Sequence, residues 1–341
     1  MIRYLIRRLY LYSITIILLL FLLFVISYQL PGSRYTILSG LNNITALQQT
    51  KLEALYQTDS NVFFEFIAFV GQRLNLEFGV SMISQNSITA ELMQTIPASL
   101  ELGLFAMFIA LLFALPLGII SAISTNKTFK RSVIIVMLIG YSIPTFWFGI
   151  LLSYNLGNTW NILPVAGRLN LLYNIETITG FLLIDSLLDQ HYYKWDALLD
   201  VLNHMFLPTC TLAIYPFTIM LRITHSTFKE IMAENYIKAA YSRGLTSFQV
   251  IKNHAIQNAI APILNNFSLL IGGFISYGII NEYIYGWPGF GQWLLNGIFQ
   301  RDHTVILSGV LIISLTIITV SIVIDITTML SNPVQRKKLY E

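Results

Sequence analysis

The sequence predicts an all-α polytopic membrane protein with six transmembrane helices. Of its 341 residues, 55% are hydrophobic and only 11% are charged, whereas soluble domains carry about 25% charged residues. Six apolar segments reach the length of about 20 residues that a helix needs to cross a bilayer. Helices are expected because backbone groups in lipid must be hydrogen-bonded internally. The segments lie at 9–30, 97–123, 132–156, 205–224, 262–282 and 304–330.

The first apolar segment is interpreted as a retained anchor. Arg3, Arg7 and Arg8 precede it, as they would in a signal peptide. However, the stretch is long, and YQLPG follows it instead of a small-x-small cleavage site.

The basic residues orient the chain, because cytoplasmic loops carry an excess of Lys and Arg. With both termini in the cytoplasm, fourteen of the 20 basic residues fall on the inner side. This topology divides the chain into a cytoplasmic end with the first helix (1–30), an extracytoplasmic segment (31–96), a core (97–330) and a cytoplasmic tail (331–341). The core contains a cytoplasmic loop at 225–261. The inner basic residues are Arg3, Arg7, Arg8, Lys127, Lys130, Arg131, Arg222, Lys229, Lys238, Arg243, Lys252, Arg336, Lys337 and Lys338.

A polar, basic and helix-prone stretch at 234–264 interrupts the apolar segments on the inner side. Ala239, Ala240 and Gly244 form a small-residue cluster that would let another backbone approach closely. Gly244 is well placed to end a helix. Either this stretch docks a partner, or it is a solvated loop that follows the positive-inside bias.

Several residues in or beside the apolar segments allow a functional or a structural reading. Pro144, in SIPTFWFG, should kink the third segment, either beside a pathway or only for packing. Glu101 and Asp325 are acids within apolar segments, where carboxylates are costly and suggest function; a hydrogen-bonded structural role fits equally.

Aromatic residues gather on the outer side after the fifth segment, in NEYIYGWPGFGQWL (281–294). Tyr283, Tyr285, Trp287 and Trp293 fit an interfacial belt. Pro288, Gly289 and Gly291 predict a tight turn, which is either an anchor or an outer gate.

Apolar residues at helical spacing also mark the outer segment 31–96. Phe63, Phe66, Ile67 and Val70 could lie flat at the membrane interface, or the helix could pack against its neighbours.

The sequence shows no motif for disulfide, metal, nucleotide-binding or hydrolytic chemistry. Cys210 is the single cysteine, and no histidine pair has ligand spacing, so we expect no disulfide and no metal site. No P-loop, HExxH motif or nucleophile elbow is present. We expect no cofactor, no catalytic residue and no nucleic-acid partner.

Several motifs together resemble the permeases of ABC importers, in their dipeptide/oligopeptide form. YIKAAYSRGL with IKNHAIQNAIAPIL resembles the EAA loop of that family. LEFGVS, PASLEL, SIPTFWFG, ILPVAG, WPGFG and the spacing from Asp325 to Asn332–Pro333 look like further signatures, in the right order. The resemblance covers essentially the whole chain. RLNLLYNIETITGFLLIDS (168–186) resembles the B-type subunits of Sap peptide-transport permeases.

The resemblance implies a type I ABC-importer permease fold in the bacterial inner membrane. It implies a heterodimer with a paralogous permease, two ABC ATPase subunits that use ATP and Mg, a periplasmic solute-binding protein and contact with membrane lipids. Lys238 stands where the family's signature has a glutamate. The implied ATPase-coupling residues are Tyr236, Lys238, Ala239, Ala240, Arg243, Gly244 and Leu245, and the pathway or gate candidates are Glu101, Pro144, Trp147, Glu282, Trp287 and Pro288.

The implied function is ATP-driven transport of peptides, with cationic antimicrobial peptides, and hence resistance to them, as one possibility. Polyamine (putrescine) export through the same type of complex is an alternative. A stand-alone secondary transporter or channel would instead show internal repeats or a polar midplane site, and a membrane-embedded enzyme would need clustered catalytic residues. Neither pattern is visible in the sequence.

Overall fold

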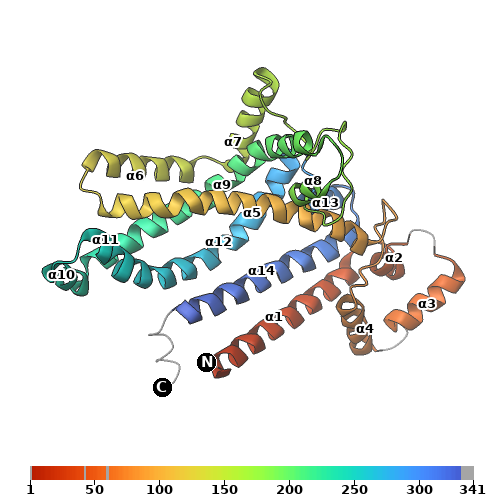
Figure 1. The fold of residues 1–341 in the computed structure, drawn as a ribbon. Coiled ribbons are helices and arrows are strands. Elements are labelled where there is room, and N and C mark those ends of the chain that lie inside the picture. The colour runs from red at the N-terminus through yellow and green to blue at the C-terminus, as the bar shows by residue number, and fades with distance from the viewer. Residues whose placement is uncertain (1, 42–43, 59–60, 332–341) are drawn as a thin grey trace. The chain divides into compact units, whose positions relative to one another are not determined.

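The computed structural model describes residues 2–41, 44–58 and 61–331, and every regular element in this part of the chain is a helix (Figure 1). One isolated antiparallel bridge joins Val80 and Ser87. Residues 332–341 of the predicted tail, which include Asn332 and Pro333, lie outside the described residues. The elements are α1 (Ile2–Gln29), α2 (Arg34–Ser39), α3 (Ala46–Tyr56), α4 (Val62–Leu74), α5 (Ile88–Ile123), α6 (Lys127–Ser142), α7 (Thr145–Leu152), η1 (Ser153–Thr159), α8 (Leu182–Leu188), α9 (Lys194–Ala233), α10 (Asn235–Ser242), α11 (Ser247–Val250), η2 (Ile251–Ala255), α12 (Ile256–Ile284), α13 (Phe290–Phe299) and α14 (His303–Ser331).

The six predicted membrane segments are confirmed as helices, five of them continuous and one broken. By length and composition, the continuous spans are Ile6–Gln29, Ile88–Ile123, Lys194–Ala233, Ser247–Ile284 and His303–Leu330. Most extend beyond the predicted apolar runs; α9 has 40 residues where 205–224 was expected. Hydropathy marks only the part of a helix that sits in lipid, and polar residues continue the same helix into water.

The predicted segment 132–156 is not one kinked helix, so that expectation was wrong. α6 ends at Ser142, α7 begins at Thr145, and the chain turns by 94° between them. Ile143 and Pro144 are both extended, with ψ angles of 122°. Proline disfavours the helical conformation of the residue before it, so the chain leaves the helix altogether at this point.

The chain forms two compact units. Unit 1 contains the described residues up to 98 together with 288–319, and unit 2 contains 99–287 and those from 320 onward. α5 and α14 therefore each begin in unit 1 and end in unit 2. The predicted division at 31–96 and 97–330 follows the sides of the membrane, and it stays a prediction.

Unit 1 is built around the C-terminal half of α1 and the helices that follow it. Phe24 of α1, Leu38 of α2 and Phe69 of α4 are buried in its core together with residues of α13 and α14. α3 begins with a capping box, in which Thr45 and Gln48 each satisfy the other's backbone N–H. α4 lies across the end of α1 (Figure 1).

Unit 2 is centred on α9, which packs against α6, α7, α8, α10 and α12. One apolar cluster, which includes Val133, Met137, Met220 and Leu270, joins α6, α9 and α12. A second cluster lies where α9 ends and α10 to α12 begin, and this is the cluster that positions the inner stretch 234–264.

Candidate functional site

The stretch 234–264 contains the short elements α10, α11 and η2, which lie between the long helices α9 and α12. α10 starts one residue after α9 ends, because Glu234 is extended, with ψ at 148°. At the other end of α10, Leu245 N–H donates to the Ala240 carbonyl at 3.4 Å and Gly244 N–H donates to that of Tyr241 at 2.9 Å. This is a Schellman turn with Gly244 in the left-handed region at φ +84°. The prediction that Gly244 ends a helix is confirmed.

The chain then returns to the membrane without a flexible linker. Thr246 and Gln249 form a capping box that opens α11. α11 passes through the π-helical turn η2 into α12 as one span from Ser247 to Ile284. α10 is therefore joined to α9 through one residue and to α12 through α11 and η2, and α9 and α12 pack along each other.

Burial divides the predicted coupling residues into two groups. Ala240 is buried with Ile237, Phe228 and Val250, and Leu245 packs half-buried on the same cluster. These two residues hold α10 on its own chain, so Ala240 does not belong to an outward cluster with Ala239. The exposed members are Tyr236, Lys238, Ala239, Arg243 and Gly244.

Two aromatic residues that the sequence reasoning missed are also exposed here. Phe248 is 73% exposed and Tyr241 is 40% exposed. The available signal for Phe248 was a phenylalanine within the Thr246–Gln249 capping box of an otherwise polar loop. Partial burial and the nearby Glu234 carboxylate raise the pKa of the Tyr236 phenol, so it is neutral at pH 7. We name the exposed set the coupling surface: Tyr236, Lys238, Ala239, Tyr241, Arg243, Gly244 and Phe248.

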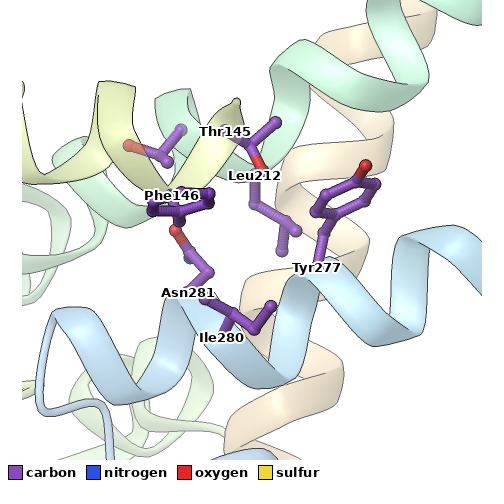
Figure 2. Close-up of a pocket in the computed structure, with 7 residues that line it drawn as sticks. Thr145, Phe146, Leu212, Tyr277, Ile280 and Asn281 are labelled. Atoms are coloured by element: carbon purple, nitrogen blue, oxygen red, sulfur yellow. The ribbon is translucent and has the colours of Figure 1, made fainter. Parts of the chain in front are cut away.

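A small cavity lies at the break between α6 and α7. Thr145 and Phe146 of α7, Leu212 of α9, and Tyr277 and Asn281 of α12 line it (Figure 2). Its volume of about 10 Å³ is that of about one water molecule, so it is far too small to hold a peptide.

Hydrogen bonds near the break join α7, α9 and the C-terminal end of α12. The Tyr285 hydroxyl donates to the Gly149 carbonyl at 3.0 Å and lies 2.8 Å from the Thr211 hydroxyl. The Asn281 amide donates to the Pro208 carbonyl at 3.0 Å. Two of the predicted gate candidates lie on the surface near the break: Pro144 is exposed, and Trp147 is 49% exposed.

The aromatic belt predicted at 281–294 is wrong for two of its four members. Tyr285 is 1% exposed and Trp287 is fully buried, whereas Tyr283 is 49% exposed, as a belt residue should be. Trp293 is half-buried and donates its indole N–H to Glu91 at 2.7 Å. Aromatic residues near a membrane end show the same sequence pattern whether they face lipid or pack in a core.

Glu101 anchors the loop that runs from η1 to α9 in unit 2. Its carboxylate is buried, pairs with Arg168 at 2.5 Å and accepts the Leu183 N–H at 2.7 Å. The Arg168 guanidinium also lies 5.4 Å from the Trp287 ring. This is the hydrogen-bonded structural arrangement, and a role for Glu101 or Trp287 in the pathway stays a prediction.

The remaining gate candidates differ in burial. Glu282 is 4% exposed, whereas Pro288 is exposed. Among the described residues, no three His, Cys, Asp or Glu side chains gather to hold a metal ion.

Comparison with known families decides the identity. Residues 114–337 match the family described as binding-protein-dependent transport system inner membrane component. The chain belongs to this family. It is therefore a multi-pass permease component of an ABC transporter in the inner membrane, and it is not the subunit that hydrolyses ATP. An ATPase and a binding protein are its expected partners in such a system.

Three relatives show which members of the family are similar. The chain is 35% identical over 310 residues to the di/tripeptide transport system permease protein DppB of Pseudomonas aeruginosa, covering 89% of this chain and 90% of the relative. It is 31% identical to the dipeptide transport system permease protein DppB of Escherichia coli, covering 99% of this chain and 100% of the relative. It is 34% identical to the putrescine export system permease protein SapB of Escherichia coli, covering 78% of this chain and 83% of the relative. The similarity therefore does not single out the Sap type.

Proposed function

We propose that this chain is one of two permease subunits of an ATP-driven importer of short peptides. The two DppB relatives, which match at least 89% of this chain, are named for di/tripeptide and dipeptide transport. In this proposal a paralogous permease completes the pathway, two ATPase subunits dock on the inner side, and an external binding protein delivers the peptide. Both termini lie in the cytoplasm.

The coupling surface is the observation that carries the proposal. Ala239 and Gly244 present little side chain between the larger Tyr236, Tyr241 and Phe248, so another protein's backbone can approach α10 closely. A Cβ added at Gly244 would meet no atom within 4 Å. The exposed Lys238 and Arg243 suit acidic groups on the docking protein.

Transport follows from how α10 is connected. When the ATPase dimer closes, the docked α10 moves with it. Because α10 joins α9 directly and α12 through α11 and η2, both long helices shift together. Asn281 of α12 bonds to Pro208 of α9, and Tyr285, directly after α12, bonds to Gly149 of α7 beyond the break at Pro144. Two arrangements of this network would alternate access to the two sides of the membrane.

Putrescine export is a second candidate, favoured only by the name of the SapB relative. The acidic outer loop offers it little support, because two of its carboxylates, those of Asp185 and Asp200, hold the loop together. Asp185 is 1% exposed and accepts three hydrogen bonds from Thr179 and Gly180. Asp200 accepts the Asn170 N–H at 2.7 Å.

Transport by the reconstituted complex separates these candidates. Proteoliposomes containing both permeases and both ATPases would be given labelled dipeptide, a cationic antimicrobial peptide or putrescine, with and without binding protein, in both orientations. We expect dipeptide uptake that requires ATP and binding protein, and we expect none with a hydrolysis-deficient ATPase. Putrescine movement outward without binding protein, and no dipeptide uptake, would overturn the proposal.

A further inference from the structure

The polarity of α4 is inverted relative to a helix on a water-facing surface. The side chains that it exposes are apolar: Val62 (56%), Phe63 (63%), Phe64 (53%), Ile67 (50%) and Leu74 (73%). Its two charged residues, Glu65 and Arg73, are 3% and 6% exposed. A water-facing helix buries its apolar stripe and exposes its charges, so water does not explain this arrangement.

The inward charges of α4 have partners within unit 1. The Glu65 carboxylate forms an ion pair with Arg34 and accepts a hydrogen bond from the Tyr28 hydroxyl at 2.6 Å. Arg73 donates to the Glu77 carbonyl at 2.7 Å, and its guanidinium lies 4.9 Å from the Phe69 ring. The fold of unit 1 therefore provides partners for both buried charges of α4. The exposed apolar face of α4 is not explained by a lack of packing neighbours.

The exposed face of α4 continues the apolar surface of a membrane span. The Phe66 ring lies 5.7 Å from that of Phe21 and 5.4 Å from that of Phe24, both in α1. Phe21 is itself 51% exposed and lies eight residues before the span ends at Gln29. At 1.5 Å per residue, this contact lies about 12 Å below the end of the span. α4 therefore reaches the depth of the hydrocarbon boundary.

We propose that α4 is an interfacial membrane helix, whose outer face of Val62, Phe63, Phe64, Ile67 and Leu74 lies in the outer leaflet of the bilayer. A lipid partner suits a face that presents no charged side chain and adjoins α1. Interfacial helices bury their apolar face about 5–10 Å into the headgroup boundary. The segment after α1 would then be fixed on the membrane as well as on its own chain, giving unit 1 a second lipid contact.

The neighbouring helix α3 provides an internal control. It exposes Gln48, Gln49, Thr50 and Lys51 as well as Leu47 (69%) and Leu55 (42%), and it packs between α2 and α4. The side of α3 that carries Gln49, which donates to Glu53, is polar, so a label at Gln49 should respond oppositely to labels on α4 when lipid and aqueous probes are compared.

Site-specific fluorescence in nanodiscs tests this placement. In the full complex with Cys210→Ser, single cysteines would be introduced as Phe63→Cys, Ile67→Cys or Leu74→Cys, with Gln49→Cys on α3 as the matched control. Each would be labelled with an environment-sensitive fluorophore. Quenching would be measured with lipids that carry a nitroxide near the headgroup end of the chain, and separately with iodide.

We expect the three α4 labels to emit at shorter wavelength, to lose fluorescence with nitroxide lipids and to resist iodide. The Gln49 label should lose fluorescence only with iodide. Iodide quenching of the α4 labels would place α4 in water and overturn the proposal. Resistance of the α4 labels to both quenchers would also overturn it, because a protein partner would then cover the face. Transport activity of these variants reports on the proposed function separately, so the two proposals can fail independently.

Discussion

Two short helices of this permease, α4 and α10, bury opposite parts of their sequences. α10 buries Ile237 and Ala240 and exposes Lys238, with Arg243 exposed at its C-cap. α4 buries Glu65 and Arg73 and exposes Phe63. Both have the alternating polarity of an amphipathic helix, yet one shows its polar side and the other its apolar side.

The difference shows what helical periodicity leaves open. A period of 3.6 residues reveals two unlike faces, but the medium beyond the helix decides which face turns inward. α10 exposes polar side chains, and its apolar side chains anchor it in the buried cluster with α9 and α12. α4 adjoins a membrane span, so its charges must find partners inside the fold. The following predictions test this contrast, from the largest expected effect to the smallest.

Removal of an inward charge of α4 should have the largest effect. Glu65→Ala leaves Arg34 without its carboxylate partner and deprives the Tyr28 hydroxyl of its acceptor. Breaking a buried pair by removing one member destabilises strongly, and since Arg34 remains 26% exposed, we expect a loss of about 3 kcal/mol. Thermal unfolding of the purified protein in nanodiscs would measure it. Glu77→Ala, at an exposed carboxylate, is the control, and equal losses in both variants would contradict the account.

Truncation of an exposed aromatic side chain should have different effects on the two helices. Phe248→Ala removes the most exposed aromatic of the coupling surface. Aromatic residues often dominate interfaces, so we expect about tenfold weaker binding of the ATPase subunit, or about 1.4 kcal/mol. Phe63→Ala on α4 should leave this affinity unchanged. Titration of the ATPase onto permease nanodiscs gives both affinities. An unchanged affinity in Phe248→Ala would show that Phe248 does not contribute to the interface.

Substitution of the glycine in the Schellman turn should lower the stability of the protein by a smaller amount. Gly244 and Gly272 both leave open space for a Cβ, but only Gly244 has a positive φ. Gly244→Ala should therefore destabilise the protein by about 1 kcal/mol, whereas Gly272→Ala, in a helix, should be neutral or slightly stabilising. Thermal unfolding compares the two directly, and a stabilised Gly244→Ala would contradict the strain argument.

Local signals in the sequence predicted much of this structure. The membrane helices follow from apolar length, and the end of α10 follows from a glycine after a helix-prone stretch. The break at Pro144 was underestimated, because a proline's effect on Ile143 depends on whether neighbouring helices stabilise a turn. There, the Tyr285 hydroxyl bonds to Gly149 on the far side of the break.

Burial was the property that the sequence could not provide. Trp287 packs beside Arg168, which pairs with Glu101, and these three residues lie far apart along the chain. Phe63, Phe66, Ile67 and Val70 share a helical spacing, but Phe66 and Val70 pack inward while Phe63 and Ile67 face outward. The partners of Glu65 are likewise brought to it only by the fold.

The most direct test of the account is ATP-driven transport by an Ala239→Glu variant. Ala239 is exposed within α10, so the longer side chain can be accommodated in the isolated permease. It would overpack a close contact with the ATPase, and overpacking typically costs about 1–3 kcal/mol. Ala54→Glu makes the same change at an exposed alanine of α3. We predict that Ala239→Glu inserts normally but loses at least about tenfold of its ATP-dependent peptide uptake, while Ala54→Glu transports normally. Unchanged uptake in Ala239→Glu would contradict the coupling role of α10.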